Sequence, residues 1–432
     1  MRIRFAHIAD VHLGNQQYGL PERFDDFGRA WLDAIDHAIT REVALVVIAG
    51  DLFEQRRVEP RALLQAIEGL RRLRAANIPA LAVEGNHDRA LYREGFSWME
   101  FLDAEGYLKL LNPCVPGQPG CHYRPWKPGE GGSYVDVGGA RIIGQPYLGA
   151  SAGRAIEEMT SHLRLEGRGA AQYLIYVCHA GVEDIVPRLS GGLTGEDLDR
   201  LRPHVDYLAL GHAHISFKRD GWLFNPGALE TCRSDEADQQ SGFFYVEVDT
   251  ETEEKHRAEL ISNWRRHFLR LSFSMEDIAS PDALAVALPT FLREKITPTD
   301  DLPIVELRLT GILRFEPSRL DRDILQEKVQ QVCDSLHVEI KIMGCPEHEQ
   351  ANGHGAEHSR EVVEKQVLTG IFASEADYRE YANEWAGLAI HVKETVQQLD
   401  YDPQALIDEI TQIAEELNAL PDTQKETENA HL

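Results

Sequence analysis

Five short segments of the chain carry aspartate, asparagine and histidine side chains, which are residue types that bind divalent metal ions. Each segment follows a run of apolar, β-prone residues. Loops at the ends of strands, held on a rigid scaffold, are where functional side chains tend to lie. The pattern therefore predicts one site built from five loops. In chain order the segments are Asp10-Val11-His12, Gly50-Asp51, Gly85-Asn86-His87-Asp88, His179 and Gly211-His212-Ala213-His214.

The donor atoms of these segments are carboxylate and amide oxygens together with imidazole nitrogens. Asp10 and His12 are two residues apart, so in an extended chain they could face the same way. Asp51 ends the most apolar strand of the chain, where its two oxygens would be free to bridge two metals. This mixed set suits Mn²⁺, Fe²⁺ or Zn²⁺ better than Ca²⁺, which prefers oxygen ligands alone.

Two cations bound at such a site would be suited to phosphate ester hydrolysis. Separated by about 3.5–4 Å, they clamp a phosphate, lower the pKa of a bridging water and stabilise developing charge. His87 would be free to protonate the leaving oxygen, and Asp88 would orient its ring. Each segment alone also fits a structural loop, so the hypothesis depends on finding all five in one order.

Alternating strands and helices are expected to position these segments. Residues 2–9, 43–49 and 80–83 read as strands, and the two stretches between them carry apolar residues at helical spacing. That alternation is typical of an α/β unit. We expect packed sheets with helices outside, over about 270 residues. Further strands are predicted at 133–137, 140–144, 173–178, 207–210, 222–225 and 242–248.

The rest of the chain is predicted to form smaller parts. We place the first domain at 1–270, a small α/β module at 271–345, a polar linker at 346–359 and a helical segment at 360–420. The linker histidines could suggest a metal site, but a flexible tract lacks the fixed geometry that metal sites need. These histidines are His348, His354 and His358.

The helical segment carries two apolar seams, which begin near Tyr381 and Leu406. Two short amphipathic helices after a linker cannot bury both seams alone. They either pack on each other or on the first domain, or they dock a partner helix or coiled coil. The sequence alone leaves both possibilities open.

The composition of the chain excludes several classes of protein. The 432 residues carry a net charge of −27, which argues weakly against a generic binder of phosphate backbones. No apolar run is long enough for a membrane span, and the first motif follows the N-terminus too closely for a signal peptide. We therefore expect a cytoplasmic protein. The six cysteines form no C-x-x-C pair, so a zinc ribbon or disulfide framework is not expected.

The ordered motifs resemble those of the calcineurin-like metallophosphoesterase superfamily and, within it, the Mre11/SbcD DNA-repair nucleases. The resemblance covers about the first 230 residues, including the sequences around His12, Asp51 and His87. It implies an α/β fold in which a metallophosphoesterase β-sandwich flanked by helices precedes a small α/β cap domain and a helical C-terminal tail.

The resemblance also implies cofactors, partners and residue roles. Two Mn²⁺ ions would share Asp51, and His87 would be the catalytic histidine. The cap would contact DNA, and the tail would grip a Rad50/SbcC-type ATPase. Homodimerisation through helices near residues 60–75 and 94–103 is also possible. The first ion would be held by Asp10, His12, Asp51 and His214, and the second by Asp51, Asn86, His179 and His212.

One residue departs from the family pattern. Many family nucleases have a histidine directly after Gly-Asp-Leu-Phe, where this chain has Glu54. The predicted function is a DNA exonuclease or endonuclease subunit. The departure leaves open a small-molecule or nucleotide phosphodiesterase that uses the same dimetal site. A non-catalytic scaffold is disfavoured, because it would have no need for seven metal ligands.

Overall fold

The structure is a computed structural model, and it describes most of the first 346 residues together with parts of the C-terminal segment. Described are residues 1–91, 95–113, 120, 122–186, 192–346, 365, 368–369, 371–372, 381–396, 406–408 and 410–412.

Two six-stranded sheets form the centre of the N-terminal region, which confirms the predicted α/β class. In spatial order the first sheet contains β12 (His256–Ile261), β11 (Phe243–Asp249), β1 (Arg2–Ile8), β2 (Leu45–Ala49), β3 (Ala80–Val83) and β4 (Lys109–Leu110). The second contains β5 (Tyr134–Val137), β6 (Ala140–Gln145), β7 (Tyr173–His179), β8 (Tyr207–Gly211), β10 (Leu223–Asn225) and β9 (Phe217–Arg219).

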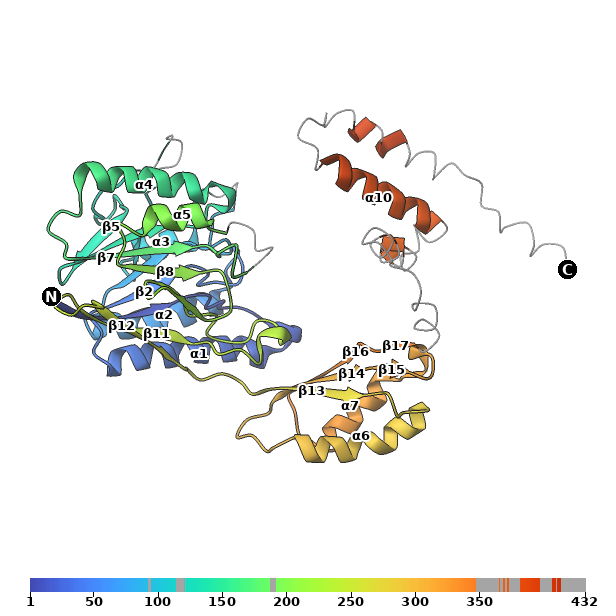
Figure 1. Cartoon of the computed structure of the whole chain (residues 1–432). Helices are drawn as coiled ribbons and strands as arrows, with labels where there is room; N and C mark the ends of the chain where they lie inside the picture. The colour runs from blue at the N-terminus through green and yellow to red at the C-terminus, as the bar shows by residue number, and fades with distance from the viewer. Residues whose placement is uncertain are drawn as a thin grey trace. The chain divides into compact units, whose positions relative to one another are not determined.

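The sheets pack face to face, and helices cover their outer faces (Figure 1). Successive side chains of a strand point to opposite faces. In β2, Val46 therefore packs toward the helices, whereas Leu45 and Val47 pack toward the second sheet. Burial on both faces explains the unbroken apolar run of this strand. The helices are α1 (Pro21–Thr40), α2 (Pro60–Ala75) and α3 (Trp98–Ala104) on the first sheet, and α4 (Ala152–Glu166) and α5 (Gly195–Leu201) on the second.

A smaller sheet with its own apolar core follows. Strands β13 (Phe268–Ser274), β14 (Ile304–Thr310) and β16 (His337–Ile342) run parallel, and helices α6 (Pro281–Lys295) and α7 (Arg322–Gln330) pack on them. The short strands β15 (Ile312–Leu313) and β17 (Cys345–Pro346) pair beside this sheet. The strands and helices alternate here, as expected for the small α/β module predicted at 271–345, and the bounds of that module stay a prediction.

Contacts divide the chain into two compact units, Met1–Pro346 and Glu347–Leu432. The domain boundary near residue 270 therefore stays a prediction. In the second unit, α10 (Ala382–Val396) contains Trp385 of the predicted seam, and its ring lies 6.4 Å from that of Phe372. His348, His354 and His358 lie outside the described residues. Among the helices that the structure describes, none is both long and apolar enough to span a bilayer.

Candidate metal centre

Parallel strand ends bring the five segments together. Strands β1, β2 and β3 are parallel neighbours in one sheet, and β7 and β8 are parallel neighbours in the other. The segments follow or close these strands, and carboxyl ends of parallel strands meet at one edge of a sheet, where ligands bind in open α/β folds. The five segments therefore converge on one site.

The backbone of four predicted ligands is in the left-handed region, which non-glycine residues rarely adopt. The φ angles of Asp10, His12, Asp51 and His212 are 50°, 53°, 51° and 85°. Strain of this kind clusters at functional sites, where the surrounding structure over-determines it. Here it belongs to the tight loops that turn each strand end toward the centre.

Two glycines allow the segments to approach closely. A Cβ atom on Gly50 would lie 2.2 Å from His179 Nδ1, and a Cβ on Gly85 would lie 2.0 Å from Asp51 Oδ1. Real atoms do not approach that closely without displacing a neighbour. The glycines of the second and third segments therefore leave space for ligand side chains from other strands.

Asp51 lies at the middle of the cluster. Its Oδ1 accepts a hydrogen bond from the His87 backbone N–H at 2.9 Å. Its Oδ2 lies 3.3 Å from His179 Nε2 and 4.0 Å from His12 Nε2. One oxygen therefore faces imidazoles from both sheets, as a bridging ligand must.

The first half of the centre contains Asp10, His12, Asp51 and His214. The Nε2 atoms of His12 and His214 face each other at 3.1 Å. His214 Nδ1 lies 2.8 Å from Glu236 Oε1, and His12 Nδ1 lies 3.0 Å from Glu54 Oε2. The Glu236 contact is a hydrogen bond, whereas the Glu54 contact has the distance of an ion pair without hydrogen-bond alignment.

The second half contains Asp51, Asn86, His179 and His212. His179 Nδ1 donates to the main-chain carbonyl of Ala49 at 2.7 Å, and its Nε2 lies 3.2 Å from Asn86 Oδ1. The rings of His179 and His212 are 5.0 Å apart. The His212 backbone N–H donates to both carboxylate oxygens of Asp10 at 3.0 Å, which ties the two halves together.

The structure gives Asp88 a role that differs from the expected orientation of His87. The Asp88 carboxylate is buried and accepts backbone hydrogen bonds from Gly85 at 2.9 Å and Phe53 at 3.0 Å. His87 Nδ1 instead lies 2.6 Å from the main-chain oxygen of Glu54. Asp88 therefore fixes the second and third loops against each other, and the carbonyl of Glu54 orients His87.

The charges of the cluster perturb its acids and bases. Burial raises the pKa of Asp51, but His179, His12 and His87 lower it further, so the net shift is downward. Burial lowers the pKa of His179, yet the Asp51 carboxylate raises it overall to about 9. Each group favours the charged form of its partner. A metal ion bound here must displace the proton from the imidazole.

The donor set fits two divalent cations. Asp10, His12 and Asp51 have ligand atoms within 4.8 Å of one another, and so do Asp51, His179 and His212. Both groups include Asp51. In the first half, two Nε2 atoms that face each other at 3.1 Å are well placed to bind a cation between them. These oxygen and nitrogen donors suit Mn²⁺, Fe²⁺ or Zn²⁺.

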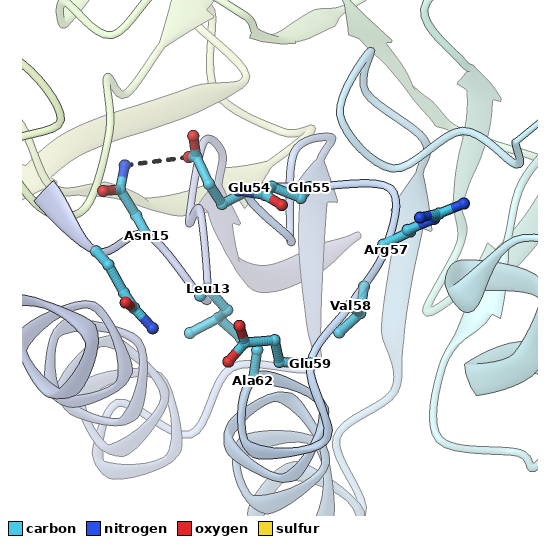
Figure 2. Close-up of a pocket in the computed structure, with 10 residues that line it drawn as sticks. Leu13, Asn15, Glu54, Gln55, Arg57, Val58, Glu59 and Ala62 are labelled. Atoms are coloured by element: carbon cyan, nitrogen blue, oxygen red, sulfur yellow. Dashed lines mark hydrogen bonds between the residues drawn. The ribbon is translucent and has the colours of Figure 1, made fainter. Parts of the chain in front are cut away.

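Two pockets adjoin the centre. One, of about 290 Å³, is lined by Asp51, His87 and His214 among others. The other, also of about 290 Å³, lies around Asn15, Glu54 and Arg57. Figure 2 shows Asn15 donating a hydrogen bond to Glu54 in this second pocket. The first pocket contains the predicted ligands and is therefore the candidate substrate site.

Sequence reasoning missed three residues of this region. It noted Glu54 only as a departure from the family, and it assigned nothing to Glu236 or Cys232. Glu236 contacts His214 from a short 3₁₀ turn, Ser234–Glu236, that follows no recognisable motif. The available signal for Cys232 was its place five residues after Asn225-Pro226-Gly227, but this spacing alone could not place it beside a metal ligand.

Comparison with known proteins identifies the region of the chain that contains this site. Residues 3–216, which include all nine predicted site residues, match the family model of the calcineurin-like phosphoesterases. A curated Mre11 DNA double-strand break repair protein from Archaeoglobus fulgidus is 43% identical over 238 residues, or 53% of this chain and 50% of that protein. Its counterpart from Aeropyrum pernix is 28% identical over 252 residues, or 57% of this chain and 58% of that protein.

The chain spans about half the length of the curated relatives it matches. A solved calcineurin-like phosphoesterase from Bacillus subtilis covers 68% of this chain and 97% of its own, with 14% identity and a TM-score of 0.40, a similarity too low to support an argument. Residues 3–216 therefore form a calcineurin-like phosphoesterase domain, and about half of the chain is similar to Mre11 proteins.

Proposed function

We propose that the chain is a metal-dependent phosphodiesterase that cleaves DNA as the nuclease subunit of an Mre11-Rad50-type complex. The observation that carries this proposal is Asp51, whose Oδ2 faces imidazoles of both halves of the centre. Two divalent ions, with Mn²⁺ as the expected metal, would share this carboxylate. The names of the curated relatives, which are DNA double-strand break repair proteins, support DNA as the substrate.

The residues of this chain would divide the work. Bound ions would polarise the phosphate and supply a metal-activated water. His87 donates Nδ1–H to the Glu54 carbonyl, so its Nε2 is the atom that can take up and deliver a proton to the leaving oxygen. Because the carbonyl fixes the ring, His87 needs no further partner to hold its orientation.

Arginines near the centre offer local positive charge in an acidic chain. Arg57 and Glu54 both line the second pocket (Figure 2), and Arg89 directly follows the third segment. Both are exposed, as is Arg233 at the candidate substrate pocket. Arginine contacts with phosphates position a nucleic acid without reading its sequence. We propose that these residues guide the DNA backbone toward the metals.

Cleavage assays test the proposed substrate. Purified protein with Mn²⁺ should cleave linear double-stranded or single-stranded DNA, and EDTA should abolish cleavage. The double variant Arg57→Ala/Arg89→Ala should bind DNA more weakly yet still hydrolyse bis-p-nitrophenyl phosphate, whereas Arg154→Ala, which changes an exposed arginine on α4, should behave as wild type. Hydrolysis of the small ester without any DNA cleavage would instead support the small-molecule phosphodiesterase.

We propose that residues 360–420 dock a Rad50/SbcC-type ATPase. The support is the apolar seam predicted around α10, together with exposed Ile371 and Ile407, whose exposed fractions are 54% and 55%. Amphipathic helices of this kind dock on partner helices. Deletion of residues 360–432 should abolish co-purification with a co-expressed ATPase. Undiminished co-purification would refute this assignment.

We also propose that the phosphoesterase region forms a homodimer. Leu64 on α2 is 62% exposed and Phe96, just before α3, is 54% exposed. Exposed apolar side chains mark an interface where they form one contiguous patch, and we propose that these two side chains belong to such a patch. Light scattering of the purified protein should give a dimer mass, and Leu64→Glu/Phe96→Glu should give a monomer. A monomeric wild type would contradict the proposal.

A further inference from the structure

Cys232 lies beside the first half of the metal centre, although it belongs to none of the five motifs. One ring nitrogen of His12, one of His214 and the sulfur of Cys232 lie within 4.8 Å of one another. The backbone N–H of Cys232 donates to Glu236 Oε2 at 3.0 Å. The carboxylate that holds His214 therefore also holds the cysteine in place.

The facing imidazoles independently point to a cation at this position. Both Nδ1 atoms face carboxylates, Glu54 for His12 and Glu236 for His214. A neutral imidazole that carries its proton on Nδ1 has a lone pair on Nε2. The two Nε2 atoms lie 3.1 Å apart and share a hydrogen bond, and a cation that replaced the shared proton would be bound by both nitrogens. The Cys232 sulfur lies within 4.8 Å of one ring nitrogen of each histidine.

The Cys232 thiol interacts with the side chain of His214 and with one main-chain oxygen. Its sulfur donates to the main-chain oxygen of Glu230 at 3.6 Å, a weak hydrogen bond that coordination can replace. On metal binding the S–H bond would break, the proton would leave to solvent and both sulfur electrons would form a bond to the metal. No oxidant or reductant is needed for this step.

We propose that Cys232 is a ligand of the first metal, so that this half of the centre selects a thiophilic cation such as Zn²⁺ or Co²⁺ over Mn²⁺. Thiolate ligands favour Zn²⁺, whereas carboxylate and amide oxygens suit Mn²⁺. The residues assigned to the second half offer oxygen and nitrogen donors. The centre would then hold two chemically different ions. This inference rests on the two-metal site proposed above.

Cobalt spectroscopy tests the ligand directly. Co²⁺ is titrated into the full chain after its metals have been removed with EDTA. Visible d–d bands report Co²⁺ bound by any protein ligands, and a near-ultraviolet sulfur-to-cobalt charge-transfer band reports a bound thiolate. The wild type should show both bands. Cys232→Ser and Cys232→Ala should lose only the charge-transfer band, and Cys333→Ser, which changes a thiol in the smaller sheet region, should keep both.

The outcomes separate this inference from the function on which it rests. Wild-type d–d bands without a charge-transfer band, or a charge-transfer band that persists in Cys232→Ser, would overturn the role of Cys232 and leave the metal centre intact. Absence of all cobalt bands would overturn both. In competition titrations, Cys232→Ser should weaken Zn²⁺ binding by about tenfold or more and change Mn²⁺ binding much less. Equal losses for both metals would also overturn the selectivity.

Discussion

The two halves of the metal centre hold their imidazoles in different ways. In the first half, the Nδ1 atoms of His12 and His214 face the carboxylates of Glu54 and Glu236. In the second, His179 Nδ1 donates to the main-chain carbonyl of Ala49, the last residue of β2. A carboxylate partner makes an imidazole a more basic ligand. In the second half the main chain holds the imidazole of His179 in place. In the first half the side chains of Glu54 and Glu236 hold the imidazoles, so substitution of these side chains can change how strongly the first half binds a metal.

The shared carboxylate should matter most, because it belongs to both halves. Asp51→Asn removes the charge that faces His12 and His179, so both ions should bind poorly. Loss of a group that only supports a metal ligand lowers activity by up to about a hundredfold. Loss of the shared ligand itself should therefore lower the rate of DNA cleavage by at least about a hundredfold. Metal content measured by mass spectrometry should fall with it. The control is Asp36→Asn, an exposed carboxylate on α1. Loss of only one ion would show that Asp51 is no bridge.

Removing the carboxylate behind His214 should affect the first half alone. Glu236→Gln leaves a neutral group at the 2.8 Å contact, so the ion nearer His214 should bind about tenfold more weakly. The ion nearer His179 should be unaffected. Calorimetric titration should therefore show one weakened site out of two. Glu259→Gln, which changes an exposed carboxylate on β12, is the matched control. Equal weakening of both sites would contradict the division into halves.

Glu54 should contribute less than Glu236 to the same half. The side chain of Glu54 is 27% exposed and that of Glu236 is 10% exposed, so solvent screens the Glu54 contact more strongly. Glu54→Gln should therefore weaken the first site by only a few-fold, less than the roughly tenfold change expected for Glu236→Gln. The same calorimetric titration measures the metal affinity of this variant. A larger loss than in Glu236→Gln would show that Glu54 is the principal support.

Protons and metals should also compete for His179 in the second half. Burial lowers the pKa of His179, but Asp51 raises it overall from 6.5 to about 9. A histidine pKa that is higher in the folded state adds stability below pH 6.5, and this stability is lost as the pH rises through about 9. The melting temperature in EDTA should therefore fall between these pH values. Mn²⁺ replaces the proton and should reduce or reverse that fall. An EDTA melting temperature that rises with pH would contradict this.

The sequence predicts well that the metal ligands lie at the ends of strands. It predicts poorly which residues hydrogen-bond those ligands and hold them in place. His179 and His212 meet because β7 and β8 are parallel neighbours, which their apolar runs could suggest. Glu236 contacts His214 because the turn Ser234–Glu236 brings it there, and no local sequence pattern predicts the course of that turn. Adjacency in sequence misled us for Asp88, because the tight turn aims its carboxylate back at backbone amides. Helices α4 and α5 were also not predicted.

Crystals soaked in Mn²⁺ would test the two-half description most directly. Anomalous scattering at the manganese edge should show two peaks about 3.5–4 Å apart, with the Asp51 carboxylate between them. One peak should lie beside His12 and His214, and the other beside His179. If the first site prefers a thiophilic ion, soaking with Zn²⁺ should place zinc in the peak near Cys232. A single peak, or peaks that do not flank Asp51, would contradict the account.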